Sequence, residues 1–171
     1  VEYLKFLGTS EYTPEAIKQE FFKLGCTYRV NVGDDEVWVN LSGLSENMPR
    51  ALELFENLLA NPVENPEALT NLVNDELKQR ADAKLNPQAI FGALLMYGIF
   101  GENNRMTHML SEEELKSTTA LELVNSLKGL NSWKHYILYY GSQPVDQVVM
   151  LMNTGHKAAA TLNPAPAPVL Y

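Results

Sequence analysis

The chain has 171 residues, a net charge of −8 and one cysteine, Cys26. This length suits a single domain, or one domain with a piece of a second, and allows a sizeable core without disulfides. A lone cysteine excludes an intrachain disulfide, which fits a reducing compartment or a periplasmic protein that uses none. The acidic balance disfavours nucleic acid or anionic lipid as a main partner. No apolar run approaches the ~20 residues of a membrane span.

Helix start signals recur along the chain. A hydroxyl or amide side chain followed by proline, or by glutamate three residues later, is typical of a helix N-terminus. Residues 4–7 are typical of the end of a helix that stops at Gly8. The predicted helices cover about residues 14–24, 46–60 (capped by Ser45), 66–85 and 87–100, two short ones after Ser111 and Thr119, and a last one over 144–154.

Three stretches predict strands. Residues 28–32 and 37–42 alternate apolar and polar side chains around a turn at 33–35, which predicts an antiparallel hairpin with one apolar face. Residues 135–140 predict a further strand that ends at Gly141. Helices mixed with antiparallel strands indicate an α+β fold. We expect two layers, an antiparallel-dominated sheet with helices packed on one face.

The C-terminal tail differs in composition from the rest. Residues 158–171, AAATLNPAPAPVLY, carry no charge and alternate proline with small residues, which predicts an extended linker. Residues 169–171 could begin a strand of a following domain. We therefore expect one α+β domain over 1–157, cut at its N-terminal side, and a linker over 158–171.

The three histidines have no metal-ligand spacing. The pattern favours His135 as the polar start of a strand, His156 as the residue trailing a helix, and His108 as a loop residue. A metal site assembled in space from these side chains is the alternative. An independent hydrolase that uses His108 or His135 is a second alternative.

Two further residues have a structural and a functional interpretation. Cys26 as a nucleophile needs a nearby base, but its apolar neighbours favour a buried structural thiol. Glu76 could be a ligand, whereas its spacing to Arg80 favours a solvated i,i+4 ion pair. The residues alone therefore indicate an α+β domain without a visible active site.

Several local sequences together resemble the insulinase-type (M16, pitrilysin) zinc peptidases over nearly the whole chain. The likeness is greatest to envelope members from Bacteroidetes-type bacteria. It rests on FLGTSEYTPEAIKQEFFKLGCTYRVNVGDDEVWVNLSGL, ALELFENLLANP, NLVNDELKQRADAK, SEEELKSTTALELVNSL and KHYILYYGS. The resemblance implies the fold that these peptidases share with LuxS and the mitochondrial processing peptidase. Members repeat this domain four times, as two halves that close around a peptide.

The resemblance also locates a degenerate catalytic motif. Active members carry H-x-x-E-H, with two zinc-binding histidines and a water-activating glutamate, shortly before a Phe-x-Gly-Thr turn, and a later glutamate completes the zinc shell. Residues 6–9 match that turn. Glu2 then matches the motif glutamate, Tyr3 the second histidine, and Glu76 the later ligand. Because a phenol must lose its proton to ligate zinc, these residues predict neither catalysis nor metal binding.

The resemblance therefore implies a non-catalytic domain of a zinc metallopeptidase. Such a domain would form part of the chamber that encloses peptide substrates, with zinc bound in the catalytic half of the parent, on the same chain or on a partner subunit. The alternative is a purely structural or assembly module. The family resemblance favours the periplasm or cell envelope of a bacterium, and an exposed sheet edge would favour a homodimer of the fragment.

Overall fold

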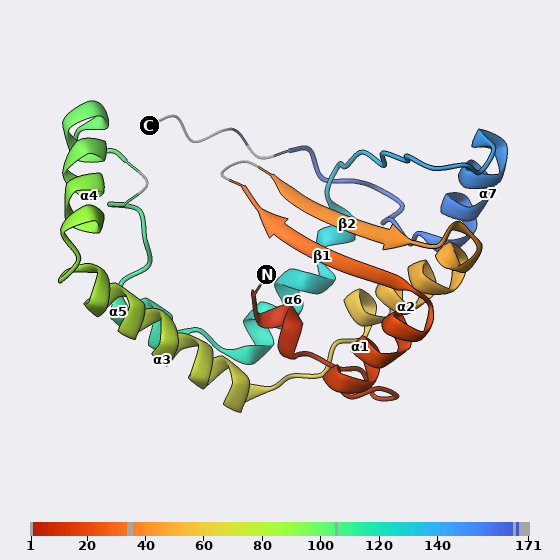
Figure 1. Cartoon of the computed structure of the whole chain (residues 1–171), viewed down its shortest axis with the longest axis horizontal. Helices are drawn as coiled ribbons and strands as arrows, with labels where there is room; N and C mark the ends of the chain where they lie inside the picture. Colours follow the sequence, from red (N-terminus) through yellow and green to blue (C-terminus); the bar gives the residue numbers. More distant parts are fainter. Residues whose placement is uncertain (1, 34–35, 105, 166, 168–171) are drawn as a thin grey trace. The chain divides into compact units, whose positions relative to one another are not determined.

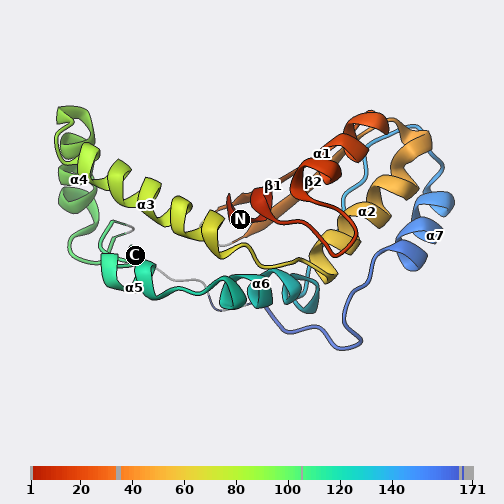
Figure 2. The same cartoon turned by 90° about the horizontal axis from the view of Figure 1, so that it is seen from below.

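The computed structural model describes residues 2–33, 36–104, 106–165 and 167 (Figure 1; Figure 2). Helices and an antiparallel hairpin make an α+β fold, as predicted. The elements are η1 (Glu2–Phe6), α1 (Pro14–Lys23), β1 (Cys26–Val32), β2 (Val37–Gly43), η2 (Ser45–Asn47), α2 (Met48–Ala60), α3 (Pro66–Ala83), α4 (Pro87–Phe100), α5 (Glu112–Ser117), α6 (Ala120–Lys128), η3 (Leu130–Ser132) and α7 (Val145–Gly155), where η marks a 3-10 helix.

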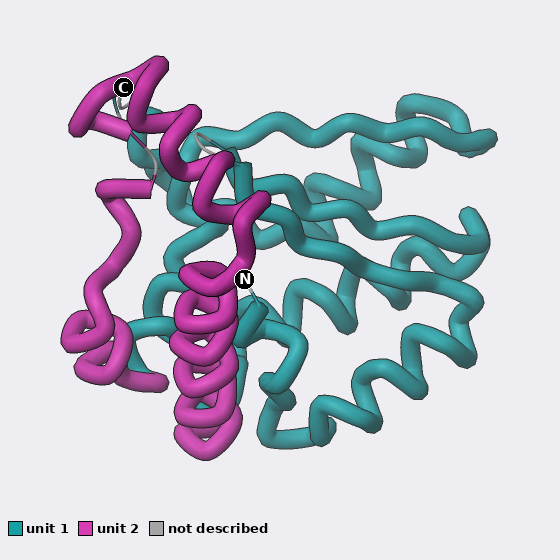
Figure 3. The backbone as a smooth tube through the Cα atoms, turned by 60° about the vertical axis from the view of Figure 1, so that its left-hand side comes forward, with its two compact units in different colours: residues 1–64, 121–167 teal, residues 65–120, 168–171 magenta. Residues whose placement is uncertain are grey.

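The chain forms two units, which Figure 3 shows in different colours. Unit 1 joins residues 1–64 to residues 121–167 and contains the hairpin with α1, α2 and α7. The described part of unit 2 is residues 65–120 and contains α3, α4 and α5.

The hairpin of unit 1 has the predicted apolar face. The register pairs Tyr28 with Leu41 and Val30 with Val39, so these four side chains lie on the same side of the two strands. The Tyr28 ring lies 4.8 Å from that of Phe21 on α1 and 5.2 Å from that of Phe55 on α2, centroid to centroid. Both helices therefore pack on this one face, and α7 packs in turn on α2.

The core of unit 1 is aliphatic and aromatic. α2 contributes more of this core than any other element, because its apolar side chains recur at the helical period. The most buried residues of this core include Leu4, Leu7, Ile17, Phe21, Ala51, Phe55, Leu58 and Val124. Cys26 is a free, buried thiol, which confirms its predicted burial.

Burial of Tyr28 gives a testable consequence for alkaline pH. Desolvation raises the pKa of Tyr28 above its usual value of about 10. The neutral phenol is therefore favoured in the fold, so its contribution to stability is complete below about pH 10 and is lost as the pH rises through the raised pKa. Absorbance titration of tyrosinate should show a component above the ordinary tyrosine range that Tyr28→Phe abolishes. An unchanged curve in that variant would contradict the assignment.

Most predicted helix starts are confirmed by their caps. The Thr13 hydroxyl accepts a hydrogen bond from the Ala16 backbone N–H, and the Asn65 side chain accepts one from Ala68. Ser111 and Glu114 form the predicted capping box at α5. α1 then ends at a turn where Gly25 has φ +59°, a conformation that favours glycine.

Three predicted elements differ from the structure. The strand predicted at 135–140 is wrong: these residues are irregular, because no strand in the described part of the chain forms a ladder with them. The helix predicted from residue 46 begins as the 3-10 turn η2, and the α-helix starts only at Met48, where Pro49 fits the first turn. The helix end predicted over residues 4–7 is instead the 3-10 helix η1, which ends at Phe6.

Unit 2 contains α4, a helix with apolar side chains on all sides. None of its residues is buried. Its exposed large side chains are Ile90, Phe91, Leu94, Leu95, Tyr97, Ile99 and Phe100. Within the described residues, no helix combines the length and the apolar character that crossing a membrane requires.

The first part of the predicted linker belongs to unit 1 and is hydrogen-bonded to the segment after α6. The backbone N–H of Lys134 donates to the Asn163 carbonyl, that of Asn163 to Ser132, and that of Ala159 to Asn131. The boundary between a domain over 1–157 and a linker over 158–171 stays a prediction. The turn residues 34–35 and the strand start suggested at 169–171 lie outside the described residues.

Candidate functional site

Glu2 and Tyr3, the expected remnants of a catalytic motif, lie on η1 in different environments. Tyr3 is 3% exposed and the neighbouring Leu4 is 1% exposed, so both belong to the core of unit 1. The Glu2 carboxylate instead accepts a 2.6 Å hydrogen bond from Lys5 Nζ, and both side chains of this ion pair are exposed. The phenol is thus a packing group, while the carboxylate is a surface charge.

The turn that follows η1 is fixed by close backbone packing. The Gly8 carbonyl accepts from the Val63 N–H, and the Thr9 N–H donates to the Tyr12 carbonyl. A Cβ at Gly8 would collide with that Tyr12 carbonyl oxygen. The Thr9 hydroxyl also accepts from the N–H groups of Glu11 and Tyr12. This turn therefore requires glycine at Gly8, and it holds the end of η1 against the segment after α2.

Glu76 lies in unit 2, on α3, and has a structural partner. Its Oε1 accepts a 2.7 Å hydrogen bond from Arg80 Nε, one helical turn later, as the spacing predicted. Arg80 Nη1 also donates to the Leu110 carbonyl, directly before α5. Glu76 therefore orients the arginine that connects α3 to the start of α5.

These residues do not fit a catalytic zinc ion. Zinc in this type of site needs imidazole and carboxylate ligands that converge on one point. Tyr3 is buried in the core, Glu2 pairs with Lys5 and Glu76 pairs with Arg80. Over the described ranges, no three His, Cys, Asp or Glu side chains are grouped so that they could hold a metal ion.

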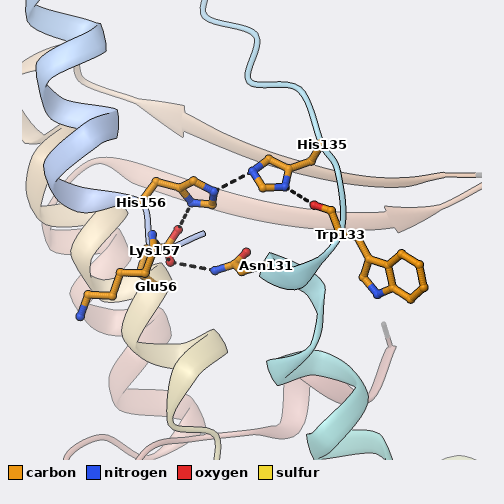
Figure 4. A network of polar contacts seen from close by, with 6 residues as sticks. All are labelled: Glu56, Asn131, Trp133, His135, His156 and Lys157. Atoms are coloured by element: carbon orange, nitrogen blue, oxygen red, sulfur yellow. Dashed lines mark hydrogen bonds and ion pairs between the residues drawn. The ribbon is translucent and has the colours of Figure 1, made fainter. Parts of the chain in front are cut away.

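A polar network in unit 1, which the sequence did not predict, joins α2, α7 and the segment after α6 (Figure 4). Its centre is Glu56 on α2, which is only 5% exposed. Glu56 Oε1 accepts a 2.6 Å hydrogen bond from His156 Nδ1, and Glu56 Oε2 accepts from Asn131 Nδ2 at 3.1 Å and from the Lys157 N–H at 3.4 Å. Each of the two carboxylate oxygens thus has partners.

The network continues from His156 to a second histidine. His156 Nε2 and His135 Nε2 are 2.9 Å apart, and His135 Nδ1 lies 2.6 Å from the Trp133 carbonyl oxygen. The third histidine, His108, is in unit 2, where its Nε2 contacts Asn103 Oδ1. Two of the three histidines are therefore brought together by the fold, although their distance in the sequence indicated otherwise.

One sequence signal does mark this network. Glu56 stands inside the apolar stripe of α2, next to Phe55 and one helical turn after Leu52. A carboxylate on a buried face needs a partner, because an unpaired buried charge is strongly unfavourable. The partners themselves lie 75 to 101 residues away, so the sequence could not identify them.

The fold is that of several proteases of known structure. The periplasmic protease PqqL from Escherichia coli matches 98% of this chain and 18% of its own, with TM-score 0.74 and 16% identity. The ferredoxin protease FusC E83A mutant, solved with Arabidopsis ferredoxin, matches 99% and 18%, with TM-score 0.77 and 15% identity. A peptidase M16 inactive domain from Pseudomonas fluorescens matches 72% and 30%, with TM-score 0.58 and 24% identity.

A family model assigns the chain to a sequence family. The model of insulinase, peptidase family M16, matches residues 1–113, and the chain belongs to this family. It spans less than a fifth of the length of PqqL and of FusC. A search of curated proteins found no match.

Proposed function

We propose that the chain is a non-catalytic domain of an M16-type zinc metalloendopeptidase and forms part of the wall of a chamber that encloses peptide substrates. The observation that carries this proposal is the burial of Tyr3. In the family pattern, Tyr3 occupies the position of a zinc-binding histidine, and its ring lies in the core of unit 1. The fold likeness to an M16 inactive domain supports the same assignment.

The proposal assigns zinc and the chemistry to another part of the enzyme. The catalytic half carries H-x-x-E-H and lies on the same polypeptide or on a partner subunit. PqqL is described as periplasmic, which supports the cell envelope of a bacterium as the location. Peptides are the substrate class, and a homodimer of the isolated chain stays a prediction that size-exclusion chromatography tests.

The first experiment tests whether the degenerate positions take part in metal binding or hydrolysis. The chain is soaked in zinc and dialysed, and its zinc content is measured by elemental analysis beside Glu2→Gln, Tyr3→Phe and Glu76→Gln. We expect all four proteins to hold the same amount of zinc and to cleave no peptide in a mixed peptide pool. Loss of zinc in one of these variants, or chelator-sensitive cleavage by the chain alone, would refute the proposal.

A second experiment separates the chamber role from a purely structural role. The half that carries H-x-x-E-H, encoded in the same gene or beside it, is purified with and without this chain. A chamber wall should raise peptide cleavage by the catalytic half, because the closed chamber holds the peptide near the zinc. Unchanged cleavage, with the two halves still bound to each other, would favour the structural module instead.

A further inference from the structure

The two facing imidazoles of unit 1 have an unusual geometry (Figure 4). The His135 and His156 ring planes are at 89° and their centroids are 4.9 Å apart, while the two Nε2 atoms are 2.9 Å apart. If the two rings lay on one line through these nitrogens, the centroids would be further apart than this. The ring axes therefore meet at an angle, and both Nε2 atoms face the same small region.

The partner of His135 Nδ1 fixes the tautomer of this ring. A backbone carbonyl oxygen only accepts hydrogen bonds, so the 2.6 Å contact to the Trp133 carbonyl requires a proton on His135 Nδ1. In a neutral ring, the other nitrogen then has no proton. His135 Nε2 thus presents its lone pair to His156.

Glu56, the partner of His156 Nδ1, likewise fixes a proton on that nitrogen. Glu56 Oε2 already accepts from two donors, and Oε1 lies 2.6 Å from His156 Nδ1. Because the Glu56 oxygens act as acceptors in the other contacts, the hydrogen in the contact with Oε1 lies on His156 Nδ1. His156 Nδ1–H therefore donates to Glu56, and in a neutral His156 ring Nε2 also presents a lone pair.

Two lone pairs at 2.9 Å repel unless a cation lies between them. A proton shared by the nitrogens is one such cation. A metal ion is the other, since metal-bound histidines have this arrangement: one ring nitrogen ligates, and the other donates to a carboxylate or a backbone carbonyl that holds the ring in place. Glu56 and the Trp133 carbonyl are these orienting groups.

We propose that His135 and His156 form a two-histidine site for a divalent transition metal such as Zn²⁺, with both Nε2 atoms as ligands. Imidazole suits zinc, copper and nickel. Zinc–nitrogen bonds of about 2.0–2.1 Å place two tetrahedral nitrogen ligands roughly 3.3 Å apart, so a small opening of the ring pair admits the metal. Water fills the remaining positions. The site shares no residue with Glu2, Tyr3 or Glu76.

The experiment is calorimetric titration of the whole chain with zinc chloride near neutral pH, followed by Co²⁺ titration read by visible absorption. We expect stoichiometric binding that His135→Ala and His156→Ala each abolish. Glu56→Gln should weaken binding by about tenfold, because this residue orients a ligand without touching the metal. The matched control is His108→Ala, which removes a histidine of unit 2 and should leave binding unchanged.

The fold of each variant is checked by circular dichroism. His135→Gln provides a second test in case His156→Ala disturbs the buried Glu56, because His135 is the outer member of the pair. Absence of zinc binding by the unaltered chain would overturn the proposal, as would binding that survives both His135 variants. The histidine pair would then share only a proton. Either result leaves the assignment of a non-catalytic M16 domain unaffected, since that assignment is tested by the Glu2, Tyr3 and Glu76 variants.

Discussion

Replacement of Glu56 by alanine is expected to lower the free energy of unfolding of unit 1 by about 3 kcal/mol. The carboxylate accepts hydrogen bonds from His156, Asn131 and the Lys157 N–H, and it is 5% exposed. Its removal leaves these donors without an acceptor in a region that water reaches poorly, and it opens a small cavity on α2. Denaturant unfolding followed by tryptophan fluorescence measures the change, because both tryptophans, Trp38 and Trp133, lie in unit 1.

Two variants separate the network from the loss of a side chain. Glu56→Gln should be intermediate, because an amide keeps one acceptor oxygen but turns an NH₂ group toward donors on the other side. Glu53→Ala is the matched control: Glu53 is on the same helix, and its pair with Arg50 is exposed. Its loss should cost less than about 0.5 kcal/mol. Equal effects of Glu53→Ala and Glu56→Ala would show that the buried network adds no stability.

Leu58→Ala is expected to destabilise unit 1 by a similar or larger amount, about 3–4 kcal/mol. Leu58 has 0% exposure on α2, the helix that packs on both the hairpin and α7. Truncation removes its buried methyl groups and leaves a cavity that the surrounding helices and strands fill only in part. The fluorescence midpoint should shift to lower denaturant with little change in slope.

The control for this variant is Leu121→Ala on α6, also in unit 1. Leu121 is 52% exposed, so the same change should cost less than about 1 kcal/mol there. A small effect at Leu58 would mean that α2 is loosely packed and that its apolar stripe is not the centre of the core.

Sequence patterns predicted the elements whose causes are local. Thr13, Asn65 and Ser111 cap helices because their side chains bond to backbone groups within three residues. Alternation predicted both hairpin strands and their shared apolar face. The strand predicted at 135–140 is wrong because strand formation has a cause that is not local. A strand depends on a partner elsewhere in the chain, and alternation alone does not supply one.

In the candidate site too, sequence patterns predicted the local contacts and missed those that depend on tertiary packing. The ion pair between Glu76 and Arg80 follows from helical spacing and was predicted. The burial of Tyr3 and the meeting of His135 with His156 depend on tertiary packing, which spacing along the chain does not encode. Only the family resemblance relates Tyr3 to a zinc-binding histidine, since a buried tyrosine is otherwise an ordinary core residue.

The helix α4 has a thermodynamic consequence for unit 2. Folding leaves large apolar side chains such as Phe91, Leu94 and Ile99 more than half exposed. Covering a side chain of this kind gains roughly 1.5–3 kcal/mol, so unit 2 retains a substantial free energy of hydration that association can release. That free energy has the temperature and salt dependence of apolar hydration: it weakens on cooling and strengthens in sulfate.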